Sequence, residues 1–174
     1  MLVGVTLAGR VAQIEVAEED ILDFPRGLVG FENYSRFVLF EMEPPFYLLQ
    51  AVDDPHLGFP LVDPFKLYPG YRAELSREEC ELLGLQEGDE RAMLCVVALS
   101  RDASPHTVNL RAPVALNSSK KLGAQVVLQE NRYLVRQPLA ARQDGSLGLH
   151  EVRNRREKRP AGIRAPTMSG ARAC

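Results

Sequence analysis

Short apolar runs alternate with polar residues along most of this chain, and proline or glycine interrupts them at short intervals. Between residues 11 and 139 the alternation has a period of two, which is the spacing of side chains on one face of a β-strand. Turn residues between such runs are typical of all-β domains. The pattern predicts strands at residues 13–16, 21–23, 36–42, 46–52, 58–61, 71–75, 91–100, 107–110, 114–117, 124–129 and 133–136.

One helix is expected among these strands. Ser76 and Glu79 have the spacing of a capping box, in which each side chain accepts a hydrogen bond from the backbone N–H of the other residue. Leu82 and Leu83 follow, and Gly84 is suited to end the helix. We therefore predict one short helix near residues 76–84.

Together these elements predict a mainly β fold, namely a small antiparallel β-barrel or folded-over sheet whose edges are closed or covered. The most continuous apolar run, at residues 92–99, is expected to form the most buried strand. The pattern ends after residue 140. We therefore divide the chain into a β domain over residues 1–140 and a basic tail over residues 141–174, which we expect to be disordered in isolation.

The charges are distributed unevenly along the 174 residues. The net charge is only −2, but residues 151–174 carry seven basic and two acidic side chains, or +5, which leaves −7 for residues 1–150. An acidic body attracts cationic surfaces and repels nucleic acid, so we expect no direct nucleic-acid binding by the body. RNA binding by the tail is a minor alternative, because no aromatic side chains are interleaved with its basic residues.

The chain shows no sign of export or of membrane insertion. Its first ten residues lack the pattern of a signal peptide, and no apolar stretch approaches the length of a membrane span. Cys80, Cys95 and Cys174 form no close pair in sequence, so we expect neither a disulfide framework nor a zinc site. No heptad pattern is present. We expect a cytoplasmic monomer.

Two segments, at residues 23–32 and 52–65, combine backbone-fixing prolines with flexible glycines, large apolar side chains and carboxylates. Loops of this composition are stiff and amphipathic, which suits a binding surface better than catalysis. The two segments, with residues 92–97, 107–117, 125–128 and 133–139 in the same order, resemble the FliW family of flagellar assembly factors. The resemblance extends over about residues 13–139.

This resemblance implies a protein that is not an enzyme and that needs no cofactor or metal. It implies two competing protein partners, the translational regulator CsrA and flagellin, so that flagellin levels control flagellin translation. The candidate partner-binding residues are Asp53, Asp54, Pro55, Phe59 and Asp63, with Phe24, Gly27, Leu28, Gly30 and Phe31 beside them. In this hypothesis Asp53 and Asp54 meet cationic side chains. Phe31 and Phe59 act as anchors, and the glycines and prolines fix the loop shape.

The alternative is a small β-barrel enzyme or a ligand- or metal-binding domain that uses Asp53, Asp54 and Asp63 with His56. Clustered carboxylates bind hard cations. However, Asp before Pro, as at residues 54–55 and 63–64, is common in turns, and the calcium-loop spacing is missing. We therefore favour turn formation and partner contact for these aspartates.

Overall fold

Seven strands close into a barrel in the computed structural model, which describes residues 1–7, 9–102, 104–129 and 131–139. Around the ring the order is β3-β4-β5-β6-β7-β9-β10, and every neighbouring pair is antiparallel except β10 with β3. The predicted mainly β barrel is thus confirmed. The described strands are β1 (Leu2–Leu7), β2 (Arg10–Glu15), β3 (Ile21–Asp23), β4 (Arg36–Glu41), β5 (Phe46–Ala51), β6 (Gly58–Val62), β7 (Arg91–Ala98), β8 (Thr107–Val108), β9 (Val114–Asn117), β10 (Leu122–Gln125) and β11 (Gln137–Pro138); the helices are α1 (Pro64–Leu67), α2 (Arg77–Leu82) and the 3₁₀ helix η1 (Glu18–Asp20).

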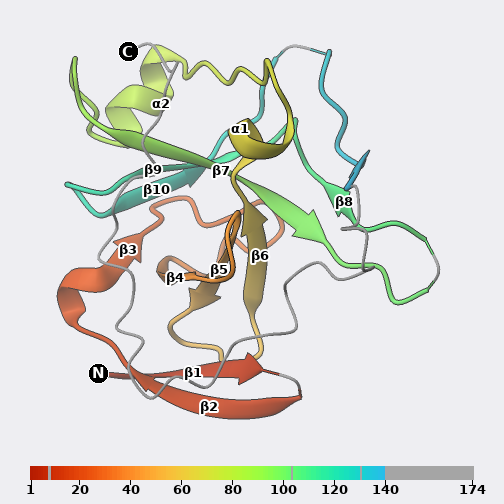
Figure 1. The fold of residues 1–174 in the computed structure, drawn as a ribbon. Coiled ribbons are helices and arrows are strands. Elements are labelled where there is room, and N and C mark those ends of the chain that lie inside the picture. Colours follow the sequence, from red (N-terminus) through yellow and green to blue (C-terminus); the bar gives the residue numbers. More distant parts are fainter. Residues whose placement is uncertain (8, 103, 130, 140–174) are drawn as a thin grey trace.

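The first two strands form a hairpin outside the barrel, at the bottom of Figure 1. β1 and β2 pair from Leu2 opposite Glu15 to Leu7 opposite Arg10. Val3 of β1 is fully buried and shares an apolar cluster with Val38 of the barrel strand β4. β1 was not predicted as a strand. It is a strand in the structure through its pairing with β2.

The core lies on both sides of β7. Ala92 and Leu94 belong to one apolar cluster, and Met93 and Cys95, at the alternate positions, belong to another. Because successive side chains of a strand point to opposite faces, both faces of β7 are covered. This explains the continuous apolar run. Six of the eight residues of β7 are buried, more than in any other described strand, but β9 is the strand in which all four residues are buried.

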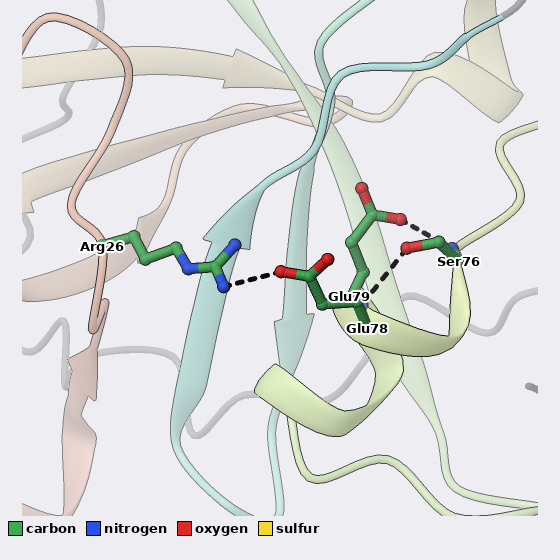
Figure 2. A network of polar contacts seen from close by, with 4 residues as sticks. All are labelled: Arg26, Ser76, Glu78 and Glu79. Atoms are coloured by element: carbon green, nitrogen blue, oxygen red, sulfur yellow. Dashed lines mark hydrogen bonds and ion pairs between the residues drawn. The ribbon is translucent and has the colours of Figure 1, made fainter.

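The predicted capping box is present at the start of α2, and Figure 2 shows it. The Ser76 hydroxyl accepts from the Glu79 N–H at 3.2 Å, and the Ser76 N–H donates to the Glu79 carboxylate at 2.6 Å. Four carboxylate-bearing residues at positions 78, 79, 81 and 87 lie in or near this helix. The helix is slightly shorter than predicted, and α1 and η1 were not predicted.

Two of the predicted strands are wrong. Residues 71–75 lie in no sheet, and residues 133–136 are not a strand. The Tyr71 N–H donates to the Tyr68 carbonyl in a turn, and the Arg72 N–H donates to the Tyr133 hydroxyl. Side chains and turns satisfy backbone groups that a strand would have paired with a neighbour.

The two cysteines within the described residues are buried, as expected of small apolar side chains. Burial raises the pKa of the Cys95 thiol to about 12, and Cys95 is free. Cys80 of α2 is disulfide-bonded. The expectation of no disulfide is therefore wrong at Cys80. The predicted tail at residues 141–174 lies outside the described residues.

Candidate protein-binding surface

Residues 24–31 form successive tight turns directly after β3. The Gly27 N–H donates to the Phe24 carbonyl at 2.9 Å, and the Phe31 N–H donates to the Leu28 carbonyl at 2.8 Å. Gly27 has a φ of +62°, and a Cβ at this position would lie only 2.8 Å from the Phe31 carbonyl oxygen. Glycine is therefore required at position 27 by the backbone conformation and by the available space.

Phe24 and Leu28 hold this segment on the barrel. Both are buried in the same apolar cluster, and the Phe24 ring meets the Phe37 ring edge-on with centroids 4.9 Å apart. Gly123 of β10 makes room for the Phe24 ring, since a Cβ there would lie 2.3 Å from a ring carbon. The hypothesis placed both side chains on a binding face. The structure places them beneath the surface, where they support the segment.

Phe31 brings the two predicted segments together. Its ring meets the Phe59 ring of β6 edge-on, with centroids 4.9 Å apart, and Phe59 lies 6.3 Å from Phe37 in the core. Phe31 is 38% exposed, whereas Phe59 is half-buried. The outer edge of this aromatic contact is thus open to solvent and its inner edge is fixed by the core.

Val29 is a surface residue that the sequence analysis missed. It is 65% exposed, and its N–H donates to the Gln125 side-chain carbonyl oxygen at 3.0 Å. Next to it, the Gly30 N–H donates to the Glu32 carboxylate at 2.8 Å, which holds the pKa of Glu32 below its usual value. The signal in the sequence was an apolar side chain at the tip of a glycine-flanked turn.

Gln50, also missed by the sequence analysis, anchors the second segment from inside. Its side chain is 1% exposed, and its Nε2 donates to the Asp54 carbonyl at 2.7 Å and to the Leu57 carbonyl at 2.9 Å. A single polar residue within an apolar run was the signal in the sequence. These bonds fix the backbone between β5 and β6, because buried carbonyl groups need donors.

The two neighbouring aspartates have different roles. Asp53 is exposed. The Asp54 carboxylate accepts from the His56 N–H at 2.9 Å and from the Tyr34 hydroxyl at 3.2 Å, so it closes a turn and ties the two segments together. The hydrogen bond and the negative charge of Asp54 raise the pKa of Tyr34. Asp53 is therefore the carboxylate that faces solvent.

Pro55 is covered by the N-terminal hairpin. The Thr6 N–H and hydroxyl both donate to the Pro55 carbonyl, at 3.0 and 2.7 Å, and the Thr6 hydroxyl oxygen lies 3.0 Å from Nδ1 of His56. A Cβ at Gly4 would lie 2.7 Å from Cβ of Pro55. Pro55 therefore lies in a close contact between β1 and this loop, which no local pattern in the sequence indicated.

Asp63 has a structural role that differs from those of Asp53 and Asp54. It is 4% exposed and caps α1, where its carboxylate accepts from the Phe65 N–H at 3.0 Å. The hypothesis placed Asp63 on the binding face, whereas the structure buries its carboxylate and uses it as a helix cap.

The described residues of these segments form an exposed surface and not a metal site. Among them, no three His, Cys, Asp or Glu side chains are grouped closely enough to hold a metal ion. None of the helices in the described part of the chain has the length and apolarity needed to cross a membrane. We call the exposed residues Val29, Phe31 and Asp53, with half-buried Phe59, the loop face. Its exposed aromatic and aliphatic groups beside a carboxylate suit contact with another protein.

Comparisons with known proteins agree with the arrangement of these segments. A family model described as FliW protein matches residues 7–139. The chain is 37% identical over 125 residues to a flagellar assembly factor FliW of Caldicellulosiruptor saccharolyticus, covering 71% of this chain and 82% of the relative. It is 39% identical over 131 residues to a flagellar assembly factor FliW of Geobacter sulfurreducens, covering 74% and 82%. A crystal structure of the flagellar assembly factor FliW matches with a TM-score of 0.71 and 32% identity, covering 80% of this chain and 99% of the other.

Proposed function

This chain belongs to the FliW family of flagellar assembly factors, and from that premise we propose that it is a cytoplasmic protein that binds CsrA and flagellin in competition. In this scheme the free protein keeps CsrA from repressing flagellin messenger RNA. Newly made flagellin captures the protein and releases CsrA, and flagellin synthesis then falls. The protein acts by binding and not by catalysis.

The observation that carries this proposal is the contact between Phe31 and Phe59. It joins the two segments on which the resemblance to the family rests, and it leaves Phe31 and Val29 exposed on a backbone that is held by internal hydrogen bonds. A fixed backbone reduces the entropy that is lost on binding. Exposed aromatic side chains on such a backbone are typical anchors of protein interfaces.

Charge supports a basic partner such as an RNA-binding regulator. Residues 1–150 carry a net charge of −7, and Asp53 is exposed in the loop between β5 and β6. Complementary charge accelerates encounter and improves selectivity, and salt screens this effect. We therefore expect the binding of CsrA to weaken as salt is raised.

The test is calorimetric titration of the full chain with CsrA and separately with flagellin, at low and moderate salt and at two temperatures. Phe31→Ala should weaken binding at the loop face more than about tenfold, the size expected for an aromatic anchor. Leu134→Ala is the matched control, because Leu134 is an exposed apolar side chain outside the loop face. It should leave both affinities unchanged.

Asp53→Lys tests the electrostatic part, since Asp53 is exposed and the change reverses its charge. It should slow association with CsrA and flatten the salt dependence. Binding of both partners by the wild type, with mutual displacement, would support the partner switch. No heat with either partner would refute the proposed function, and equal affinities for Phe31→Ala and wild type would refute the role of the loop face alone.

A further inference from the structure

The pairing between β3 and β10 is short, and beyond it one edge of the β10 backbone has no partner strand among the described residues. The two strands pair only at Leu122 with Asp23, and the Asp23 N–H donates to the Lys121 carbonyl at 2.8 Å. After Asp23 the chain turns away, whereas the backbone beyond β10 continues to bond to residues 111–113 as far as Leu128, before a bend at residue 129. Among the described residues, the backbone after Leu122 therefore has a paired neighbour only on the side of β9.

Hydrogen bonds define the direction in which this edge faces. The Val126 N–H donates to the Pro113 carbonyl and the Leu128 N–H donates to the Arg111 carbonyl, both at 2.9 Å, so these even positions face β9. Backbone groups of a strand alternate in direction with a period of two. The odd positions therefore face the open side. Within the described residues, neither the Val127 N–H nor the adjacent odd-numbered one at position 129 donates a hydrogen bond.

A cleft of about 470 Å³ lies along this edge. One wall is the edge at residues 127–129, and the opposite wall is the extended segment 74–76 with the first turn of α2. Val127 is 50% exposed and lines the cleft, while its neighbour Leu128 is buried in the core. Val127 and Leu128 both line the cleft, and of these two only Val127 is exposed.

An ion pair crosses the cleft, and Figure 2 shows Arg26 reaching Glu78 of α2. The Arg26 guanidinium lies 2.8 Å from the Glu78 carboxylate, and the two side chains are 64% and 73% exposed. An exposed pair of this kind contributes little to stability and opens readily. Three glutamates and two arginines line the cleft, so a cationic occupant is favoured over an anionic one: Glu74, Glu78, Glu79, Arg26 and Arg72.

We propose that this edge binds an extended peptide segment of a partner protein by strand addition, with apolar side chains at alternate positions and basic side chains between them. The free Val127 N–H and carbonyl pair with the peptide backbone, the apolar side chains contact Val127 and Leu75, and a basic side chain meets Glu74. This surface is additional to the loop face and does not depend on the proposed function. An unpaired edge is a template for exactly one class of partner, another extended chain.

The test uses the full chain labelled with ¹⁵N and a synthetic hexapeptide with acetylated and amidated ends. The peptide has valine at its first, third and fifth positions, with lysine, threonine and lysine between them. Amide exchange is followed by NMR at Val127 and residue 129 as the peptide is added to millimolar concentration. We expect exchange at both amides to slow at least about tenfold, because a bonded amide is protected.

Three controls separate strand addition from other binding. The same peptide with N-methyl groups at its valines keeps the side chains but cannot pair, and a version with glutamates in place of the lysines should bind more weakly. Val127→Pro removes the N–H that faces the cleft without removing a bond of the barrel, and Val127→Thr keeps that N–H. Protection should be retained in Val127→Thr and lost in Val127→Pro.

Unchanged exchange at both amides with the valine–lysine peptide would overturn the proposal. Equal protection by the N-methylated peptide would also overturn it, since that result shows side-chain binding without strand pairing. Protection that rises with protein concentration in the absence of peptide would assign the edge to a second copy of this chain and refute a peptide partner. The peptide controls need no substitution, so they remain decisive if Val127→Pro fails to fold.

Discussion

Replacing Gly27 by alanine should destabilise the protein far more than replacing Gly30, although both glycines lie in the same turn segment. Both have a positive φ, +62° at Gly27 and +83° at Gly30, so alanine is strained at either position. The two positions differ in the room available for a Cβ atom. A Cβ at Gly27 would lie 2.7 Å from the Cα of Glu32 and 2.8 Å from the carbonyl oxygen of Phe31, whereas a Cβ at Gly30 meets nothing within 4 Å.

The expected free energies follow from this difference. The left-handed conformation costs an alanine about 1 kcal/mol, and this is the whole loss expected for Gly30→Ala. At Gly27 the backbone must also move to relieve two contacts with main-chain atoms. Overpacking of this kind costs a further amount of about 1–3 kcal/mol. We therefore expect a loss of about 2–4 kcal/mol for Gly27→Ala.

Urea denaturation followed by circular dichroism measures both variants against the wild type. The midpoint should fall strongly for Gly27→Ala and slightly for Gly30→Ala, with an unchanged slope, because the area exposed on unfolding stays the same. Because Phe31 belongs to the same turn, Gly27→Ala should also weaken partner binding at the loop face. Equal losses of stability in the two variants would refute the reasoning, since they share the φ strain and differ only in the steric contacts.

Three further changes test single contacts. Gln50→Leu should lower the free energy of unfolding by about 1–3 kcal/mol, because two side-chain hydrogen bonds to part-buried carbonyls are lost; wild-type stability in a denaturation curve would contradict this. Asp54→Asn should lower the pKa of Tyr34, because the carboxylate that disfavours the phenolate is removed; ultraviolet titration measures this, and an unshifted or higher pKa would refute it. Asp63→Ala should lower the free energy of unfolding by about 0.5–2 kcal/mol through loss of the α1 cap. It should leave the affinities for CsrA and flagellin unchanged in calorimetry. Weaker binding without a greater loss of stability would show that Asp63 belongs to the binding surface.

The family resemblance and several local elements were readable from the sequence, because they depend on neighbouring residues. The capping box needs only Ser76 and Glu79 in one turn, and it is present as predicted. The alternation predicted most of the barrel strands for the same reason, since a period of two is a local property. It failed at residues 71–75, where a turn and the Tyr133 hydroxyl accept backbone N–H groups in place of a neighbouring strand.

The sequence by itself determined which residues turn the chain, which positions alternate and how the charge is divided between body and tail. Only the tertiary structure decided which side of each turn faces solvent. Phe24 is buried and Phe31 is exposed although both lie among prolines and glycines, because Gly123, far away in the sequence, makes room for the Phe24 ring. Long-range contacts such as those of Phe31 with Phe59 and of Thr6 with Pro55 have no local signature. They form only when the barrel closes, and they determine which of the predicted residues reach the surface.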